Sequence, residues 1–267
     1  MNSETLDVPY TFIQGTAPLL ISIPHMGQEI PEDIKARMTP VAHQVPDTDW
    51  HLDIMYDFAR EMGASLLHAR YSRYVVDLNR PPTDDNLYPG QTKTGLYPEY
   101  AFRGEPLYLD GQGVTEQEKT ARLEKYWKPY HDKLQQALKD IRDQHGKVLL
   151  WEGHSIASEL PRLFPGKLPD LNIGTDNGKA CDAGMLEAVE ASLTDCPFTW
   201  VLNGRFKGGY ITRQYGNPSE GIHAIQLEMC QSTYMNEDYP FEYREAVASK
   251  VKPFVQGMVD AAFKAMK

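Results

Sequence analysis

The sequence predicts an α/β fold: a single domain over residues 1–267 with a mixed, largely parallel central sheet flanked by helices. Short apolar runs typical of buried strands alternate with longer segments of helical periodicity. No internal repeat, low-complexity tract or linker divides the chain. With 267 residues, of which 41% are hydrophobic and 24% charged, the chain is long enough to bury a substantial core.

The strands are predicted from short apolar runs that end at Pro, Gly or polar residues. Leu19–Pro24 is the clearest, because its Leu and Ile residues stop at a proline and a glycine-containing loop follows. The other predicted strands are a short one carrying Val8, Tyr10 and Phe12, then Ala64–Ala69, Tyr74–Leu78, Lys147–Trp151, Leu171–Gly174, Phe198–Asn203 and His223–Met229.

Apolar residues at intervals of three and four predict the helices. The predicted helices are a short one around Glu32–Met38, then Asp49–Met62, Thr115–His145, Gly178–Leu193 and Tyr243–Lys267. Thr115 and Glu118 have the spacing of a capping box, and Gly146 is the expected stop. Asp47 or Thr48 is the expected N-cap of the helix over Asp49–Met62.

Two segments between these elements have a different character. Residues 81–114 are long, irregular and rich in Pro, Gly and Tyr, which is typical of a loop that covers a site. Gly208–Gln214 is predicted as a turn that enters an extended segment. Alternation of strands and helices, with parallel strands joined by crossovers, places the predicted strand ends at one edge of the sheet.

Composition limits the partners and the compartment. A net charge of −10 argues against nucleic acid and anionic membranes as partners and leaves a small anionic substrate, because local arginines can override the overall sign. Three cysteines without a CxxC pair indicate a reducing compartment. The N-terminus lacks the pattern of a signal peptide and no apolar run approaches a membrane span, so a cytoplasmic protein is expected. The oligomeric state is left open.

Two histidines end predicted strands in similar surroundings. His25 follows Leu19–Pro24, and His154 follows Lys147–Trp151. Catalytic zinc takes three ligands from His and carboxylate residues and keeps one position for water. Two such histidines with one carboxylate meet that need, although a single strand-end histidine more often hydrogen-bonds a nearby carbonyl.

The carboxylate ligand has three candidates. No HxxE or HExxH spacing is present, so it must come from another segment. Asp49, at the start of a predicted helix, is the leading candidate, and Asp47 is the alternative unless it caps that helix. Glu152 is less favoured, because we expect it to point away from His154.

Glu228 interrupts the apolar strand His223–Met229. A buried glutamate is rare unless it is paired or functional, and beside a metal-activated water it suits a general base. The alternative is a glutamate on an edge strand that faces solvent.

Three arginines near strand ends form a second group: Arg73, Arg80 and Arg213. Arginine binds carboxylates through a planar fork of donors and stays charged. Asn79 precedes Arg80, and the following two prolines restrict that segment. Individually each arginine is more often part of a surface ion pair; together they favour a small dianionic ligand.

Six ordered motifs carry a resemblance to a known family: IPHMG, DTDWHLD, YSRYVVDLNR, WEGHSI, GGYITR and QLEMCQSTYM. Together they resemble bacterial N-formylglutamate deformylase (N-formylglutamate amidohydrolase) over nearly the whole chain. The resemblance implies hydrolysis of N-formyl-L-glutamate to formate and L-glutamate, the last step of one route of histidine degradation. It also implies kinship with zinc carboxypeptidase and aspartoacylase enzymes, whose mixed sheet is flanked by helices.

The resemblance also implies roles for residues of the motifs. His25, Asp49 and His154 would bind Zn²⁺, with Mn²⁺, Co²⁺ and Fe²⁺ as open alternatives, and Glu228 would be the base. The Asn-Arg pair of DLNR is similar to the aspartoacylase stretch that holds the substrate's α-carboxylate, which implies this role for Asn79 and Arg80. Arg73 corresponds to the arginine that polarises the scissile carbonyl. For Arg213 we expect a contact with the γ-carboxylate.

Two other functions stay open at this stage. One is a metal-dependent amidohydrolase that acts on another N-acyl acidic amino acid. The other is a non-catalytic protein that binds dicarboxylates through its arginines alone; it predicts neither stoichiometric metal nor turnover.

Overall fold

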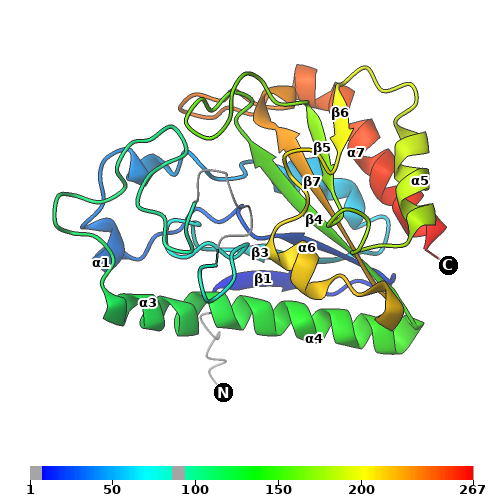
Figure 1. Cartoon of the computed structure of the whole chain (residues 1–267), viewed down its shortest axis with the longest axis horizontal. Helices are drawn as coiled ribbons and strands as arrows, with labels where there is room; N and C mark the ends of the chain where they lie inside the picture. Colours follow the sequence, from blue (N-terminus) through cyan, green and yellow to red (C-terminus); the bar gives the residue numbers. More distant parts are fainter. Residues whose placement is uncertain (1–7, 86–93, 267) are drawn as a thin grey trace.

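Seven strands form one mixed sheet in the computed structural model, which describes residues 8–85 and 94–266. Their order across the sheet is β1-β3-β2-β4-β7-β5-β6 (Figure 1). Their bounds are β1 Tyr10–Ile13, β2 Leu19–Ile23, β3 Ser65–Ala69, β4 Val148–Ile156, β5 Leu171–Gly174, β6 Trp200–Leu202 and β7 Ile222–Cys230. Strands β3, β2, β4 and β7 are mutually parallel, whereas β1 runs antiparallel to β3 and β5 antiparallel to β7. The α/β class with a mixed, largely parallel sheet is therefore confirmed.

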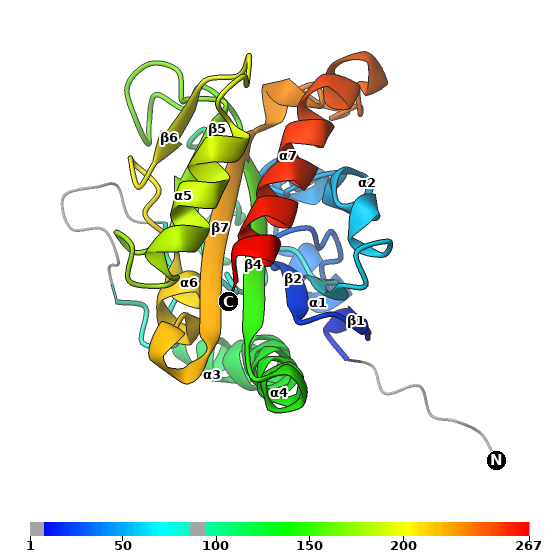
Figure 2. The same cartoon turned by 90° about the vertical axis from the view of Figure 1, so that its right-hand side faces the viewer.

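Helices cover both faces of this sheet. Their bounds are α1 Glu32–Lys35, α2 Leu52–Met55, α3 Glu116–Arg122, α4 Lys128–His145, α5 Ala183–Ser192, α6 Tyr210–Tyr215 and α7 Glu245–Ala265. One core packs α2, α5 and α7 against the sheet, and α5 lies beside α7 in Figure 2. The second core lies on the opposite face and includes side chains from α1, α4 and α6. The sheet is thus the middle of three layers.

Successive side chains of β4 point to opposite faces of the sheet. Leu149 and Trp151 of β4 pack into the core below α5 and α7, whereas Leu150 belongs to the core on the α4 side. Because side chains two residues apart share a face, Glu152 and His154 also lie on the α4 side. The parallel strands β2, β4 and β7 end at the same edge, so their last polar residues converge there.

Most of the predicted elements are confirmed, including the signals at their ends. Thr115 caps α3 through a complete capping box with Glu118, and Gly146 follows α4 in a left-handed conformation with φ of 82°. The helical stretch between them contains a π-helical turn, Leu123–Trp127. Strand β4 runs further than predicted, to Ile156, and α5 begins later, at Ala183.

The helix predicted over Asp49–Met62 is wrong in extent. Only α2 and a 3₁₀ turn at Asp57–Ala59 form. His51, in a left-handed conformation with φ of 61°, directly precedes α2, and Tyr56, with φ of −108° and ψ of 20°, ends it. His51 is the residue at the N-cap, so neither Asp47 nor Thr48 fills that role. Asp49 therefore lies in a loop that precedes the helix.

Two further predictions are wrong for a common reason. Tyr74–Leu78 is irregular rather than a strand, and Gly208–Gln214 contains α6 rather than an extended segment. In both places backbone groups bond to side chains from distant elements: Arg122 donates to the carbonyl of Val75, and Asn79 accepts from the amide of Ile211. Such tertiary partners leave no local pattern in the sequence. Of the predicted loop over 81–114, residues 86–93 lie outside the described residues.

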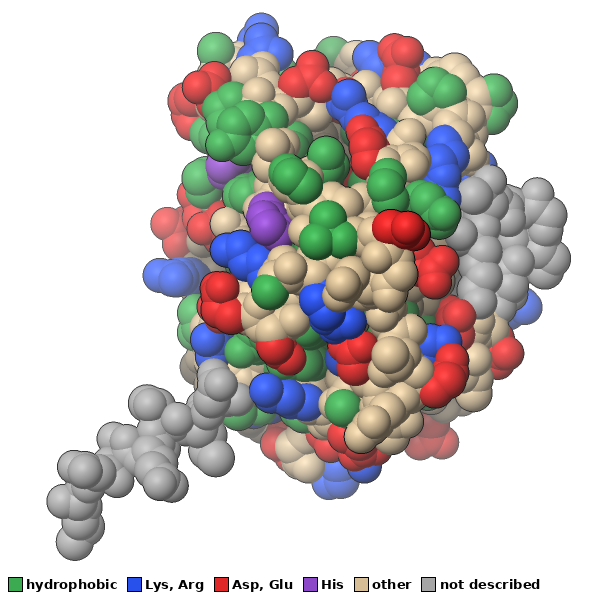
Figure 3. All heavy atoms as spheres, turned by 90° about the vertical axis from the view of Figure 1, so that its left-hand side faces the viewer, with side chains coloured by type: hydrophobic (Ala, Val, Ile, Leu, Met, Phe, Trp, Pro, Cys, Tyr) green, Lys and Arg blue, Asp and Glu red, His purple; other side chains and the backbone are tan. Residues whose placement is uncertain are grey.

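The charge distribution on one face and the state of the three cysteines complete the description of the fold. Acidic and basic side chains are interspersed with hydrophobic ones on the face in Figure 3, without an extended patch of one charge. Cys181, Cys196 and Cys230 are free thiols.

Among the described residues, no helix has both the length and the hydropathy of a membrane span.

Candidate active site

Three buried side chains converge at the carboxyl edge of the sheet: His25, Asp49 and His154. Each offers one ligand atom, and these atoms lie within 4.8 Å of one another. Oδ2 of Asp49 lies 3.1 Å from Nδ1 of His154 and 3.8 Å from Nδ1 of His25. Oδ1 of Asp49 is buried and has no hydrogen-bond partner among the described residues. Two imidazoles and a carboxylate with an unpartnered oxygen fit a divalent cation.

The backbone brings these three residues together. His25 follows β2, and the neighbouring parallel strand β4 carries His154. Asp49 reaches the same place from the loop before α2, because its amide donates to the carbonyl of His25 over 3.0 Å. His51 then adopts a left-handed conformation directly before α2 begins. Asp49 is thus fixed beside His25 by the backbone and not by helical periodicity.

Each imidazole also contacts a carboxylate of its own through Nε2. Nε2 of His25 lies 2.7 Å from Oδ1 of Asp77, and Nε2 of His154 lies 2.6 Å from Oε1 of Glu152. Both rings therefore direct Nδ1 towards Asp49. Histidines that bind metals commonly place a carboxylate on the other nitrogen, which fixes the ring and its tautomer.

Sequence reasoning missed both of these carboxylates. Asp77 is the first residue of the DLNR motif, in which only Asn79 and Arg80 were expected to have a role, in binding the substrate's α-carboxylate. The expectation that Glu152 points away from His154 is wrong, because side chains two apart on a strand share a face. That two-residue spacing was the signal in the sequence that could have found Glu152.

The pKa values of the two imidazoles are shifted in opposite directions. Burial lowers the pKa of His25, and the charge of Arg73 adds to this effect. Burial also opposes the charged form of His154, but the carboxylates of Glu152 and Asp49 outweigh it and raise the pKa to about 10. Binding of a metal requires the neutral imidazole, so a cation at this site would displace a proton from His154.

Glu228 lies beside His154 on the adjacent strand. The parallel register of β4 and β7 pairs these two residues directly. β7 is an interior strand between β4 and β5, and the exposed fraction of Glu228 is 8%, so the alternative of a solvent-facing edge residue is wrong. Burial, with the nearby carboxylates of Asp49 and Glu152, raises its pKa to about 8 against the opposing charges of His154 and Arg73.

Arg73 is the arginine at the centre of the site. It is buried, and its Nη2 donates to Oδ2 of Asp77 over 2.6 Å. Its guanidinium also stacks over the ring of Phe102, with 4.6 Å from Cζ to the centroid. The other N–H groups of Arg73 have no hydrogen-bond partner among the described residues. Arg73 thus keeps donors for a ligand while Asp77 holds its orientation.

Asn79 and Arg80 follow on the same loop and are partly engaged. Nδ2 of Asn79 lies 3.1 Å from Nε2 of His154, and its Oδ1 accepts from the amide of Ile211. Arg80 donates to the carbonyl and the hydroxyl of Thr94 and to the carbonyl of Asn79. These bonds use three of the five guanidinium N–H groups of Arg80.

Arg213 lies on α6, the helix that follows Gly209. Its Nη1 lies 3.4 Å from Asp176, and its Nε donates to the carbonyl of Gly208. The preceding residue, Thr212, donates from Oγ1 to Oε2 of Glu152 over 2.6 Å. Helix α6 is therefore tied to the carboxylate that holds His154, and Arg213 lies one residue from that tie.

Asp47 lies outside the histidine cluster. Its Oδ2 accepts from the hydroxyl of Tyr74 and the amide of Phe102, each over 2.8 Å. Burial raises its pKa to about 6 against these two hydrogen bonds and the charge of Arg73. Of the two aspartates that the sequence offered as ligands, Asp49 is the one beside both histidines.

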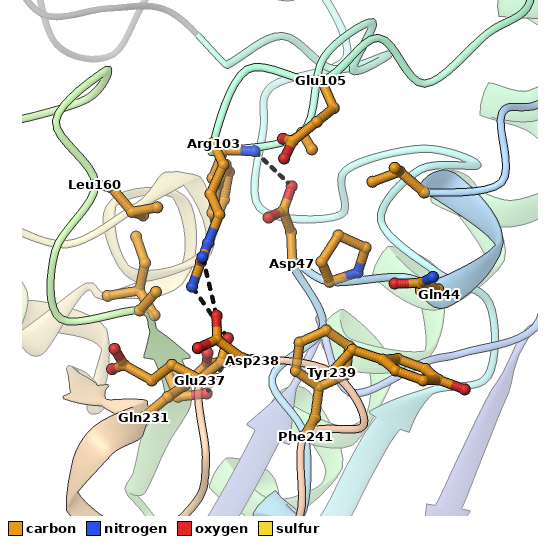
Figure 4. Close-up of a pocket in the computed structure, with 17 residues that line it drawn as sticks. Gln44, Asp47, Arg103, Glu105, Leu160, Gln231, Glu237, Asp238, Tyr239 and Phe241 are labelled. Atoms are coloured by element: carbon orange, nitrogen blue, oxygen red, sulfur yellow. Dashed lines mark hydrogen bonds and ion pairs between the residues drawn. The ribbon is translucent and has the colours of Figure 1, made fainter.

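A cavity of about 170 Å³ opens next to Asp47 (Figure 4). Asp47, Glu105, Glu237 and Asp238 line it, and Arg103, also in the lining, pairs with Asp238. This acidic lining is unfavourable for a dianion. The cationic side chains with open donors lie instead on the loop of Arg73 and Arg80.

Comparisons with known proteins show which family this chain is similar to. The family described as N-formylglutamate amidohydrolase matches residues 17–235. The N-formylglutamate deformylase of Pseudomonas putida is 48% identical over 257 residues, which is 96% of each chain. The chain belongs to the N-formylglutamate amidohydrolase family. The N-formylglutamate deformylase of Pseudomonas aeruginosa is a further relative, 46% identical over 259 residues and 96% of each chain.

The fold of this member of the N-formylglutamate amidohydrolase family is similar to that of solved structures. It is similar to the crystal structure of N-formylglutamate amidohydrolase from Ralstonia eutropha JMP134, with 25% identity, a TM-score of 0.79 and 97% of each chain covered. A gene product of Agrobacterium tumefaciens shares the fold at 19% identity, with a TM-score of 0.73 over 96% of this chain and 95% of that one. The family resemblance in the six sequence motifs is confirmed.

Proposed function

We propose that this chain hydrolyses N-formyl-L-glutamate to formate and L-glutamate, with Zn²⁺ bound by His25, Asp49 and His154. The observation that carries the proposal is the buried cluster of these three side chains, with Glu228 next to His154. The names of the two Pseudomonas relatives support the substrate. When bound, such an ion lowers the pKa of a coordinated water and polarises a carbonyl group.

Glu228 is the proposed proton carrier. Its pKa of about 8 lies near neutral pH, where a carboxylate exchanges protons efficiently with water and with a leaving amine. It accepts a proton from the attacking water and returns it to the nitrogen of glutamate as the C–N bond breaks. A bound cation would lower this pKa and favour the basic form.

Arg73 is proposed to stabilise the oxyanion that develops on the formyl oxygen when water attacks the formyl carbon. Its remaining donors are held in place by Asp77 and by stacking on Phe102. One well-placed donor of this kind contributes about 3–4 kcal/mol to stabilising a transition state. Because the guanidinium is already oriented, little reorganisation accompanies the reaction.

The two carboxylates of the substrate are assigned to the residues around the cluster. Asn79 and Arg80 are proposed to bind the α-carboxylate, since Nδ2 of Asn79 has a second proton and Arg80 has two N–H groups beyond those bonded to Thr94 and Asn79. Arg213, from α6, is proposed to bind the γ-carboxylate. Two cationic anchors would select glutamate over neutral amino acids.

The test is hydrolysis by purified protein depleted of metal with a chelator and then supplied with Zn²⁺, Mn²⁺, Co²⁺ or Fe²⁺ in turn. Formate release from N-formyl-L-glutamate is expected only after metal is restored. Metal bound per chain is measured in parallel by mass spectrometry, with one equivalent expected. Turnover that survives complete depletion would contradict the metal assignment.

Substrate analogues separate the alternatives. N-acetyl-L-glutamate and N-formyl-L-aspartate are assayed beside N-formyl-L-glutamate, and the last is expected to have the highest kcat/KM. A higher value for another acyl group would indicate a different N-acyl amino acid amidohydrolase. Binding of glutamate without metal or turnover would indicate the non-catalytic dicarboxylate-binding protein.

A further inference from the structure

The loop Val75–Arg80 holds site residues without regular secondary structure. Asp77 bonds to His25, and Asn79 contacts His154. Arg80 follows directly. The loop is largely buried, so its backbone carbonyls need hydrogen-bond partners from other elements. Whatever supplies those partners sets the position of the side chains that the loop carries.

Three side chains of one long helical stretch supply them. Nη1 of Arg122 donates to the carbonyl of Val75 over 3.1 Å. Nε2 of His131 lies 2.9 Å from the carbonyl of Leu78. Nε1 of Trp127 donates to the carbonyl of Arg80 over 3.0 Å. The donors are thus aimed at the start, middle and end of the loop.

The π-helical turn Leu123–Trp127 brings these donors to one face. In an uninterrupted α-helix, residues five apart point about 140° away from each other. A π-helical turn closes i to i+5 hydrogen bonds, so Arg122 and Trp127 come close to alignment. The step from Trp127 to His131 is four residues, one ordinary α-helical turn. π-helical turns inside α-helices are frequently found at functional sites.

Aromatic packing fixes the two ring donors. The rings of Trp127 and His131 are stacked, with centroids 3.8 Å apart and 24° between planes. Nδ1 of His131 lies 2.9 Å from the hydroxyl of Tyr215, which donates to it when Nε2 carries the proton. Tyr210 packs against both rings. Tyr210 and Tyr215 belong to α6, so the same cluster also contacts the helix of Arg213.

We propose that Arg122, Trp127 and His131, aligned by the π-helical turn, are positioning residues that hold Asn79 and Arg80 at the substrate's α-carboxylate. The proposal rests on the substrate-binding roles proposed above for these two residues. None of the three donors touches the metal cluster in the described structure. Their loss is therefore expected to weaken substrate binding more than the chemical step.

The variant Trp127→Phe tests this directly, because it keeps an aromatic ring and removes the indole N–H donor. The KM for N-formyl-L-glutamate is expected to rise about threefold to tenfold, the loss of one hydrogen bond to a positioned group. Both kcat and the metal bound per chain are expected to stay within about twofold of the wild-type values. A purely structural role would lower the active fraction and leave KM unchanged.

Trp151→Phe is the matched control. It also removes a buried indole donor, bonded to the hydroxyl of Tyr56 over 3.1 Å, but in the core on the opposite face of the sheet. Its melting temperature is expected to fall while KM stays at the wild-type value. Equal KM changes in the two variants, or no KM change in Trp127→Phe, would overturn the proposal.

Hydrogen exchange gives a readout that does not depend on catalysis. Backbone amides of residues 77–80 are expected to exchange faster in Trp127→Phe than in the wild type, and at the wild-type rate in Trp151→Phe. Unchanged exchange in Trp127→Phe would refute the positioning role. If wild-type protein does not hydrolyse the substrate, the proposed function fails, whereas the exchange result still decides whether the indole holds the loop.

Discussion

Oε1 of Glu152 lies 2.6 Å from Nε2 of His154, two residues further along the same strand. The other oxygen of Glu152 accepts from the hydroxyl of Thr212 over 2.6 Å. Both carboxylate oxygens are thus engaged, and the residue is fully buried. This arrangement fixes the imidazole with Nδ1 directed towards Asp49, which is what binding of a metal through Nδ1 requires.

Glu152→Gln is expected to weaken metal binding about 10-fold to 100-fold. The amide offers one oxygen in place of two, so either His154 or Thr212 loses its acceptor. Competition with a chromophoric chelator measures the dissociation constant. Glu124→Gln, at an exposed glutamate paired with Lys128, serves as the control and should bind metal as the wild type does. Equal affinities in both variants would show that Glu152 does not support the ligand.

Glu228→Gln is expected to lower kcat by about 10²-fold to 10⁴-fold, the usual range for a lost general base. The change removes the proton acceptor and preserves the shape of the side chain. Metal bound per chain is expected to stay at the wild-type level, because Glu228 is outside the cluster of His25, Asp49 and His154. Near-normal turnover in this variant would rule out Glu228 as the base.

Asp77→Ala is expected to lower the free energy of unfolding of the metal-free protein by about 3–5 kcal/mol. The substitution leaves the buried guanidinium of Arg73 without its ion-pair partner and removes the acceptor of His25. Urea unfolding measures the change. Asp143→Ala, at an exposed aspartate paired with Lys139, should leave stability almost unchanged. A loss no larger than in this control would contradict a central role for the Asp77 pair.

The site shows which parts of a structure the sequence can predict. His25, His154 and Glu228 were found because each interrupts or ends an apolar strand, and strand ends of a parallel sheet share an edge. Asp49 was assigned through a helix that does not extend to it; its amide bonds instead to the carbonyl of His25. That contact joins two loops, and no local sequence pattern predicts it.

Tertiary partners account for the elements that the sequence did not predict. Tyr74–Leu78 has the composition of a strand, but its carbonyls bond to side chains of the helical stretch around Trp127. Helix α6 starts where Gln226 and Asn79 accept the amides of Gly209 and Ile211. Propensity and periodicity describe neighbours along the chain, whereas these bonds join residues far apart in it.

His131→Gln is expected to change how stability depends on pH. Burial lowers the pKa of His131 to about 3, against an ordinary value of 6.5. Between these values the unfolded chain binds a proton that the folded chain does not, so the free energy of unfolding falls as the pH drops below about 6.5, with a limiting slope of about 1.4 kcal/mol per pH unit.

Glutamine cannot titrate, and its amide can still donate to the carbonyl of Leu78. The variant should therefore be less stable than the wild type at pH 7 and approach it as the pH falls towards 5. Urea unfolding at several pH values measures this difference; a difference independent of pH would show that His131 is not held neutral in the fold.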